Sequence, residues 1–527
     1  MQRRHNVKKK PTVYVVVLCL WAVCVAVLVA SLAWTVAKIP HPLGAKGVAV
    51  VCLLATNTFA LALLWLGSIK DFVFSCAYKL ASKSMQKAYQ QVEEQAQLPT
   101  TSPRFVLLYC TCNDFNPTAL LQSSHQHYNN YKTVILDDST DQRYVKQIDD
   151  FVDTHAQFEL VRRVGRQGYK AGNLNNYLEG RTDYDYFVVL DADEIVPPNY
   201  IQKVQKYFAF DKLCGAVQAR HTATEGENVF QQLLGLSVGS NGKTVQVVKN
   251  FYGANALLGH GMTVSRACYQ KTGGFPHVVA EDISFAVEVK NAGMNVLYAP
   301  DVLCQEQFPN NYVALKKRQC KWTQGNLEYM AKYNKDISKC PMTWFEKLDV
   351  RISHYSLPIV PMLGLLLTAC TIALGFLGYP TIAYSLGVYL LMLLFLASPL
   401  IPDLFVYRKS KKFALLLPYF VVTVCTYASL APMMIRTVLL GLLGKKAVFL
   451  VTPKQSKKFT FFEALKYTAD SLLFALATSV LSLLACGSIL PVILVVVGCA
   501  VAPFLVLLAN VPATTLQKKK KSKRQNT

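Results

Sequence analysis

The stretch from Tyr186 to Glu194 is a short apolar run that ends in three acids interrupted by one alanine. The β-branched and aromatic residues of the run indicate a buried strand, and Pro197 and Pro198 prevent its continuation. Asp191 and Asp193 are spaced i and i+2, so both carboxylates can turn toward one hard cation where the strand becomes a loop. Taken alone, this D-x-D pattern is equally well explained by an acidic turn.

Other acids occupy equivalent positions along the middle of the chain. Over residues 103–335, apolar strand-like runs alternate with polar helical stretches, which predicts an α/β domain with a largely parallel sheet. The runs are Phe105–Cys110, Thr133–Leu136, Tyr186–Leu190 and Gly215–Gln218. Asp114 follows the first run and Asp138 follows the second. Because ligands of such sheets bind beyond the carboxyl ends of the strands, three acidic strand ends favour a binding site over a turn.

The rest of the chain has the composition of a membrane protein. Hydrophobic residues make up 52% of the sequence and are concentrated in blocks, while the net charge of +23 lies mainly at the termini and in loops beside those blocks. Basic residues in such places indicate cytoplasmic anchors rather than a nucleic-acid surface, so we expect no nucleic-acid partner. The fifteen cysteines include no C-x-x-C pair, and we interpret them as reduced small hydrophobes rather than disulfide partners or zinc ligands.

The apolar blocks predict an integral, multi-pass protein of the plasma membrane whose lipid partner is the bilayer and whose α/β domain faces the cytosol. The expected order is two spans in 1–70, an amphipathic linker in 71–102, the α/β domain in 103–335, an interfacial helix (Trp344–Tyr355) and spans in 336–442, a cytosolic loop in 443–468, two spans in 469–510 and a basic tail in 511–527. Residues 413–442 have basic clusters on both sides. We therefore expect six spans, with 413–442 re-entrant, interfacial or pressed against the bundle.

The chain resembles the membrane-integrated family-2 glycosyltransferases, which include cellulose, hyaluronan, chitin and other β-glucan synthases. The resemblance covers about residues 103–330 and the flanking spans. It implies a GT-A-type cytosolic glycosyltransferase domain inserted in an α-helical transmembrane bundle with interfacial helices. It also implies that Asp191 and Asp193 bind Mg²⁺ or Mn²⁺ on the diphosphate of a nucleotide sugar. The chemistry agrees, because the charge that develops on a diphosphate leaving group needs neutralising.

The same resemblance assigns residues to the nucleotide sugar. Cys110–Asp114 stands where the family has a P-T-Y-N-E-like turn, Leu136–Ser139 resembles the uracil-contacting D-D-G turn, and Arg166–Asn173 resembles the H-A-K-A-G-N segment. Arg318–Trp322 stands at the Q-x-x-R-W motif, with arginine for glutamine and lysine for arginine. The implied donor contacts are Thr111, Asp114, Asp138, Lys170, Asp191, Arg318 and Lys321. For Asp138, an Asx-turn is the alternative interpretation.

Catalysis and acceptor binding are assigned in the same way. Ala280–Asp282 resembles the T-E-D motif, which makes Asp282 the general base, with Glu281 beside it. Without that resemblance, two acids before a helix are more often an N-cap. Trp322 is expected to stack against the acceptor sugar. His260, in a G-H-G sequence, is either an acceptor contact or a buried structural histidine.

A second, distant motif lies in the cytosolic loop. Phe449–Lys454 resembles the F-x-V-T-x-K gating loop that covers the occupied donor site. The resemblance implies that Thr452 and Lys454 reach the diphosphate. A short extended segment on the inner membrane face is the alternative.

These assignments predict an inverting, metal-dependent, processive synthase that transfers sugar from a UDP-sugar, most often UDP-glucose among relatives, to a growing β-glycan and exports it. The alternative is a non-processive membrane glycosyltransferase that adds one sugar to a lipid acceptor. A transporter or channel with a degenerate cytosolic domain is disfavoured, because the D-x-D and E-D motifs are both intact.

Overall fold

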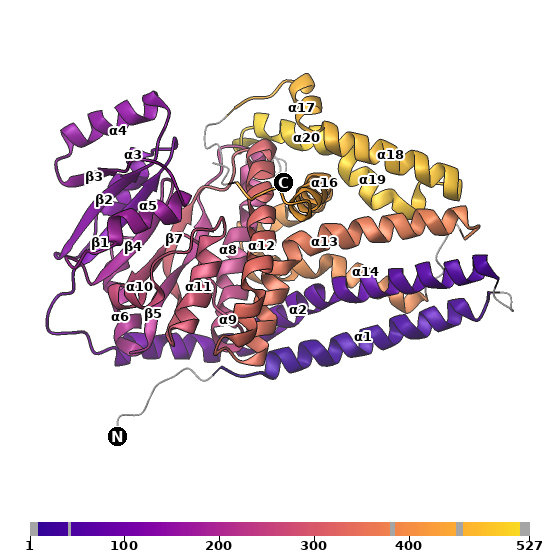
Figure 1. Cartoon of the computed structure of the whole chain (residues 1–527), viewed down its shortest axis with the longest axis horizontal. Helices are drawn as coiled ribbons and strands as arrows, with labels where there is room; N and C mark the ends of the chain where they lie inside the picture. The colour runs from indigo at the N-terminus through magenta and orange to yellow at the C-terminus, as the bar shows by residue number, and fades with distance from the viewer. Residues whose placement is uncertain (1–8, 40–43, 380–384, 449–456, 517–527) are drawn as a thin grey trace, which may run out of the picture.

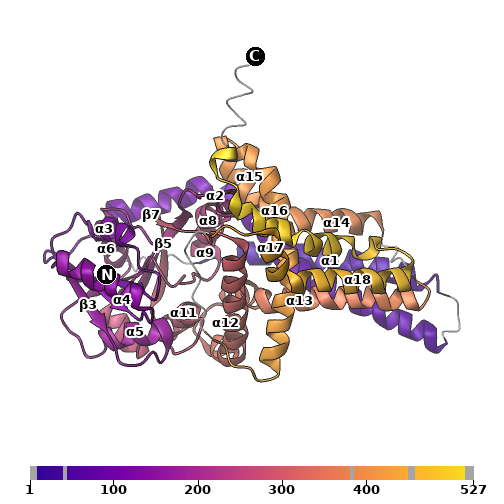
Figure 2. The same ribbon diagram turned by 90° about the horizontal axis from the view of Figure 1, so that it is seen from above.

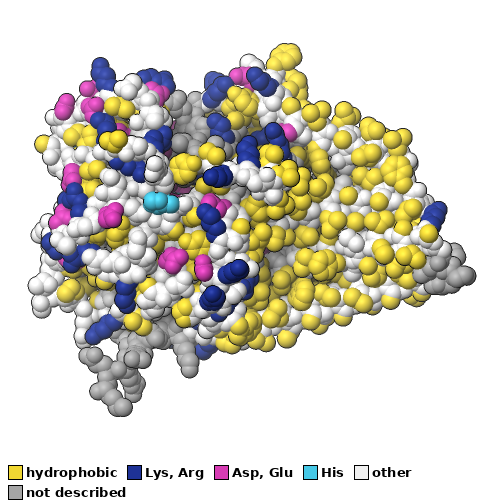
Figure 3. Space-filling model, viewed as in Figure 1, with side chains coloured by type: hydrophobic (Ala, Val, Ile, Leu, Met, Phe, Trp, Pro, Cys, Tyr) yellow, Lys and Arg dark blue, Asp and Glu magenta, His cyan; other side chains and the backbone are white. Residues whose placement is uncertain are grey.

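The computed structural model describes residues 9–39, 44–379, 385–448 and 457–516. Figure 1 shows two regions along the long axis of the molecule, an α/β region at one end and long helices that extend away from it. The space-filling view in Figure 3 shows that charged side chains gather over the α/β region and hydrophobic side chains over the long helices. This division matches the alternation of polar and apolar blocks along the sequence.

The α/β region is built on one seven-stranded sheet with the order β3-β2-β1-β4-β6-β5-β7. Strand β6 pairs antiparallel with both of its neighbours, and the other pairings are parallel. The predicted α/β domain with a largely parallel sheet is therefore confirmed. The strands are β1 (Phe105–Thr111), β2 (Tyr131–Asp137), β3 (Phe158–Arg162), β4 (Tyr186–Asp191), β5 (Cys214–Ala223), β6 (Met262–Ser265) and β7 (Asn295–Glu306).

Helices cover both faces of this sheet, which explains why β1 is apolar at nearly every position. Its side chains alternate between the faces: Leu107 and Tyr109 pack in the core beneath α4 and α6, whereas Val106 and Leu108 pack beneath α5 and α11. The helices of the region are α3 (Pro117–Ser124), α4 (Gln142–Thr154), α5 (Tyr169–Leu178), α6 (Tyr200–Phe210), α7 (Val229–Leu234), α8 (Leu236–Lys243), α9 (Val245–Tyr252), α10 (Arg266–Thr272), α11 (Glu281–Asn291) and α12 (Tyr312–Lys339).

The parallel register fixes where the acidic strand ends lie. Cys110 of β1 is opposite Asp191 of β4, and Thr111 is opposite Asp137 of β2. The residues that follow these three strands therefore meet at one edge of the sheet. This is the edge at which the sequence predicts a binding site.

Seven helical stretches in the described part of the chain are long and apolar enough to cross a membrane, whereas the sequence analysis expects six spans. They are Thr12–Val36 (α1), Ala45–Gln95 (α2), Trp344–Phe376 (α13), Leu386–Tyr407 (α14, Leu386–Ala397, and α15, Ile401–Tyr407), Lys412–Leu442 (mainly α16, Leu416–Leu442), Ala469–Cys486 (α18) and Leu490–Asn510 (mainly α19, Ile493–Ala500, and α20, Ala502–Leu507). The short α17 (Phe461–Tyr467) precedes α18.

The additional stretch contains α16, the segment that the basic flanks made ambiguous. α16 is one continuous helix. Figures 1 and 2 show that α16 runs across the direction of α1, α2, α13 and α18 rather than along it. It packs against α12, α13, α18 and α19. The position of residues 413–442 relative to a membrane stays a prediction.

Two further boundaries differ from the prediction because helices continue through them. The expected linker 71–102 is largely the second half of α2, and the expected interfacial helix Trp344–Tyr355 is the first half of α13. Pro358 and Pro361 lie inside α13 without ending it. Packing of α13 against α2 and α12 supports the helix on both sides of these prolines.

A buried carboxylate connects the long helices to the α/β region. Asp349 of α13 is fully buried, accepts hydrogen bonds from the Tyr14 hydroxyl at 2.5 Å and the Ala254 amide at 2.8 Å, and lies 3.7 Å from Lys70 Nζ and 3.6 Å from Lys249 Nζ. These partners belong to α1, α2, α9 and the loop after α9. One side chain therefore joins three long helices to the helices beneath the sheet.

The substitution Asp349→Ala is expected to destabilise the protein by about 3–5 kcal/mol, because it leaves two buried ammonium groups without their nearest carboxylate. The measurement is thermal unfolding of the full chain in detergent, where the midpoint should fall. Asp336→Ala, which removes an exposed carboxylate from α12, is the control and should leave the midpoint unchanged. Equal midpoints for both variants would contradict the anchoring role of Asp349.

Candidate active site

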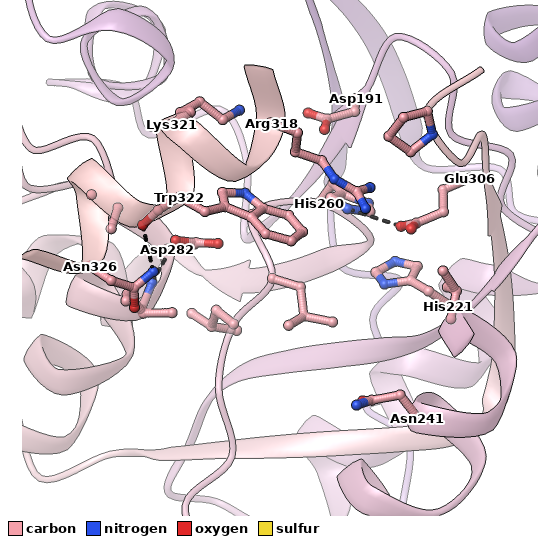
Figure 4. A pocket seen from close by; sticks show the side chains of 18 of the residues that line it. Asp191, His221, Asn241, His260, Asp282, Glu306, Arg318, Lys321, Trp322 and Asn326 are labelled. Carbon is pink, nitrogen blue, oxygen red and sulfur yellow. Dashed lines mark hydrogen bonds and ion pairs between the residues drawn. The ribbon is translucent and has the colours of Figure 1, made fainter. Parts of the chain in front are cut away.

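A cavity of about 530 Å³ lies beyond the end of β4. The sequence-predicted residues that line it are Lys170, Asp191, Asp193, His260, Glu281, Asp282, Arg318, Lys321 and Trp322. They come from α5, the end of β4, the loop before β6, the start of α11 and the middle of α12. Figure 4 shows Trp322 and Arg318 between Asp282 on one side and His260 on the other. The fold therefore brings together residues that are separated by up to about 150 positions in the sequence.

The D-x-D carboxylates lie at the sheet edge, as predicted. Asp191 is the last residue of β4 and forms an ion pair with Lys170, whose Nζ also donates to the Gly259 carbonyl at 2.7 Å. Asp193 Oδ2 accepts a hydrogen bond from the Gln307 amide at 2.9 Å. Burial lowers the pKa of Lys170, but the charge and hydrogen bond of Asp191, together with the charges of Cys110 and Glu281, raise it above its usual range. Two carboxylates that line one cavity are a donor set that fits Mg²⁺ or Mn²⁺.

Glu281 and Asp282 form the first turn of α11. The N-cap residue Ala280 makes no side-chain capping bond, and Asp282 Oδ1 accepts a hydrogen bond from the adjacent Ile283 amide at 2.8 Å. Burial, and then the like charge of Asp282, raise the pKa of Glu281 to about 7. Burial also raises the pKa of Asp282. Two buried acids whose pKa values are raised toward neutrality are suited to exchanging a proton with a substrate.

Three of the predicted residues lie on one stretch of α12. Arg318 and Trp322 are spaced i and i+4, so their side chains lie on the same face. The Arg318 guanidinium is 4.6 Å from the Trp322 ring centroid and 4.7 Å from that of Phe308. Burial lowers the pKa of Lys321, although acids across the cavity oppose this effect. The helix thus presents two cationic groups and an aromatic face, 43% exposed, to the cavity.

Thr111, Asp114 and Asp138 lie outside the cavity lining, one or two strands away. Thr111 Oγ1 donates to Asp114 Oδ1 at 3.1 Å. Asp138 forms a bidentate ion pair with Arg163, with N···O distances of 2.9 and 2.7 Å. Asp137 Oδ1 accepts a hydrogen bond from the Ser139 amide, two residues on, in an Asx-type bond. The Thr140 amide, which an Asx turn of Asp138 would use, donates to Asn113 Oδ1 instead. The sequence analysis missed Arg163, which follows β3 and has no motif of its own.

His260 belongs to a charged cluster that the sequence analysis also missed. Its Nδ1 is 3.1 Å from Glu194 Oε2 and its Nε2 is 3.2 Å from Glu306 Oε2. Burial lowers the pKa of His260, but the charge and hydrogen bond of Glu194 raise it to about 10. Glu194 also contacts His221 and is fully buried. Glu194 directly follows the D-x-D motif, and this third acid could have indicated the cluster, because a buried carboxylate requires a partner.

The expected gating residues Thr452 and Lys454 lie outside the described residues. The chain that leads toward them is described as far as Val448. The Val448 amide donates to Gln324 Oε1 at 3.2 Å. This contact positions the end of the preceding segment beside α12, the helix that carries Trp322.

Comparisons with known proteins agree on the class of enzyme. Residues 186–431 match the family model described as glycosyl transferase family group 2. The beta-monoglucosyldiacylglycerol synthase of Synechocystis sp. is 28% identical over 241 residues, which is 44% of this chain and 50% of that protein. The alignment thus spans about half the length of this relative.

Solved structures with a related arrangement include other transferases. The mannosyltransferase PcManGT from Pyrobaculum calidifontis, in complex with GDP-Man and Mn²⁺, has a TM-score of 0.42 and 21% identity, covering 69% of this chain and 99% of that one. S. aureus TarS 1–349 in complex with UDP-GlcNAc has a TM-score of 0.33 and 12% identity, covering 57% and 91%.

The region matched by the family model begins at β4 and includes the D-x-D, E-D and Trp322 positions. The glycosyltransferase class predicted from the sequence is confirmed by the family model and the curated relative. Residues 186–431 of this chain are therefore similar to glycosyl transferase family group 2.

Proposed function

We propose that this protein is a membrane-bound, inverting glycosyltransferase that transfers one sugar from a UDP-sugar, UDP-glucose in particular, to a lipid acceptor. One observation carries the choice of acceptor. The cavity that contains the D-x-D and E-D carboxylates is also lined by Ser353, His354, Ser356 and Leu357 of α13, a helix apolar enough to cross a membrane. A lipid hydroxyl can reach such a cavity while its acyl chains stay in the bilayer. The name of the Synechocystis relative supports a lipid acceptor.

The donor end of the cavity supplies positive charge for the leaving diphosphate. A divalent cation held by Asp191 and Asp193 would neutralise the charge that develops there. Lys170 and Lys321 add ammonium groups from α5 and α12. Lys321 acts as a point charge rather than the bidentate fork of an arginine. Arg318 is a further cation within reach of the same cavity.

The acceptor end supplies the base. Asp282 takes the proton of the acceptor hydroxyl while its oxygen attacks the anomeric carbon, and the bond from that carbon to the diphosphate breaks. Direct displacement inverts the anomeric configuration, so the product has a β-linkage. Burial raises the pKa of Asp282, which strengthens it as a base. We assign the domain to the cytosolic side of the plasma membrane, because basic residues flank its neighbouring apolar helices.

The second candidate is a processive β-glycan synthase that exports its product. Trp322 favours it, because an exposed indole on the cavity wall can stack against the sugar at the end of a growing chain. The resemblance of residues 449–454 to a gating loop also favours it. Both candidates use the same donor site and the same base. They differ in the acceptor that binds along the cavity wall formed by Trp322 and α13, which is a lipid in one and a growing glycan in the other.

Product analysis distinguishes the two candidates. Purified full chain is incubated with labelled UDP-glucose and Mg²⁺ or Mn²⁺ in vesicles that contain diacylglycerol, and the products are separated by organic extraction and size. A one-sugar glycolipid is the expected result. Glycan of high molecular weight would instead support the processive synthase and overturn the lipid acceptor.

Asp282→Asn is expected to lower the transfer rate by about 10²–10⁴-fold, because the amide cannot accept the acceptor proton. The rate of label transfer is the measurement, with binding of UDP as evidence that the site is intact. Asp336→Asn, on the exposed face of α12, should transfer at the wild-type rate. Retained transfer in Asp282→Asn would remove it as the base.

The pH profile tests the coupling between the paired acids. Burial raises the pKa of Asp282, and a base is inactive once protonated, so kcat/KM of the wild type should fall with decreasing pH at a higher pH than for an ordinary aspartate. In Glu281→Gln the like charge is gone, the pKa of Asp282 falls, and the acid limb should move to lower pH. Glu288→Gln on the same helix, outside the cavity lining, is the control. An unchanged acid limb in Glu281→Gln would show that the two acids are not coupled.

A further inference from the structure

Two histidines and a glutamate gather at the end of the cavity opposite Asp282. His221 lies in β5, His260 lies in the loop before β6, and Glu306 is the last residue of β7. All three line the cavity. A candidate ligand atom from each residue lies within 4.8 Å of the other two. Figure 4 shows the three side chains together, on the far side of Trp322 from Asp282.

Glu194 holds the two imidazole rings in a defined orientation. Its Oε1 is 3.0 Å from His221 Nε2, and its Oε2 is 3.1 Å from His260 Nδ1. Each ring therefore uses one nitrogen for Glu194 and keeps the other for a different partner. Metal-ligating histidines are commonly held in this way, with the nitrogen that does not bind metal donating to a carboxylate. The rings are stacked, with centroids 4.4 Å apart.

One of the two remaining nitrogens indicates a missing ligand. His221 Nδ1 is buried and has no hydrogen-bond partner within the described ranges. His260 Nε2 is 3.2 Å from Glu306 Oε2. Leaving a buried polar atom unpaired is costly, and such an atom in a native fold often marks an ion or a water. A cation at this position would satisfy His221 and the negative charge of Glu306 together.

The backbone is shaped around this cluster. Gly261 has a φ of +56°, and a Cβ on it would come within 2.3 Å of His221 Nε2 and 2.4 Å of Glu194 Oε1. The loop can therefore pass beside the buried pair because this residue has no side chain. The arrangement depends on the specific sequence Gly259-His260-Gly261 and on the acid that follows D-x-D.

We propose that His221, His260 and Glu306 bind a divalent transition-metal cation at a site separate from the D-x-D carboxylates. Two imidazoles and one carboxylate are typical ligands of Zn²⁺, whereas Mg²⁺ prefers oxygen ligands. Three protein ligands leave a coordination position open, and here it faces the cavity, where an oxygen of a substrate or a water can occupy it. Asp191 is paired with Lys170 and contributes to the other site.

The test is metal binding without nucleotide. Full-length protein in detergent is stripped with a chelator, loaded with Zn²⁺, desalted and analysed for bound metal by mass spectrometry. The wild type and an Asp191→Asn/Asp193→Asn double variant should each retain about one Zn²⁺ per chain. His221→Gln and Glu306→Gln should bind it at least about tenfold more weakly. His354→Ala, a histidine on the same cavity wall, is the matched control and should retain the metal.

Two results would overturn the proposal. One is a wild-type protein that retains no Zn²⁺, which would leave a protonated His260 as the link between Glu194 and Glu306. The other is retention in both cluster variants together with loss in the D-x-D double variant. Co²⁺ loading gives a second readout, because ligation by imidazole should produce visible absorption bands that His221→Gln changes. Since no substrate is present, the result does not depend on the proposed transferase reaction.

Discussion

The site depends on ion pairs that neutralise the acidic side chains brought together by the sheet. Parallel pairing of β2, β1 and β4 brings several acids to one edge, where partial burial makes unpaired carboxylates costly. Three of these acids pair with a basic side chain from a different element: Asp191 with Lys170, Asp138 with Arg163, and Glu194 with His260. These pairs fix the side chains around the cavity before any substrate arrives.

Glu281 and Asp282 are the exception to this compensation, and the exception is chemically useful. Across the cavity from the paired acids, these two carboxylates lie next to each other at the start of α11. Burial and mutual repulsion raise the pKa of Glu281 to about 7, although the charge of Lys170 opposes the shift. The site thus contains carboxylates whose charged form is stabilised, which suits cation binding. It also contains carboxylates whose charged form is destabilised, which suits proton transfer.

The sequence predicted the elements whose evidence is local. The apolar runs of β1, β2, β4 and β5, the long apolar helices and the D-x-D and E-D turns could all be recognised from neighbouring residues. Strands β3, β6 and β7 were not predicted. For β3 and β6 the reason is their length, because four or five residues carry little periodic signal. The continuity of α2 and α13 was also missed. Each helix has one apolar half and one polar half, and tertiary packing rather than composition keeps it unbroken.

The cluster around Glu194 could not be predicted because its members come from separate elements. His221, His260 and Glu306 are distant in the sequence, and each has an ordinary neighbourhood when considered alone. Arg163 was missed for the same reason. A buried charge implies that a partner exists, but the identity of the partner follows from strand order, here β4 beside β6 and β5 beside β7. Long-range pairing of charges is therefore the part of this site that required the three-dimensional structure.

Ser353 connects the cavity to the network around Asp349, which bears on how an acceptor is presented. Ser353 of α13 lines the cavity, accepts hydrogen bonds from Lys70 and Lys249 at 2.9 Å each, and donates to Asp349 at 3.1 Å. The wall of the cavity nearest the apolar helices is therefore held by the network that joins those helices to the α/β region. Under the proposed function, a lipid hydroxyl that follows α13 into the cavity meets a rigid surface, and its distance from Asp282 is set by the fold.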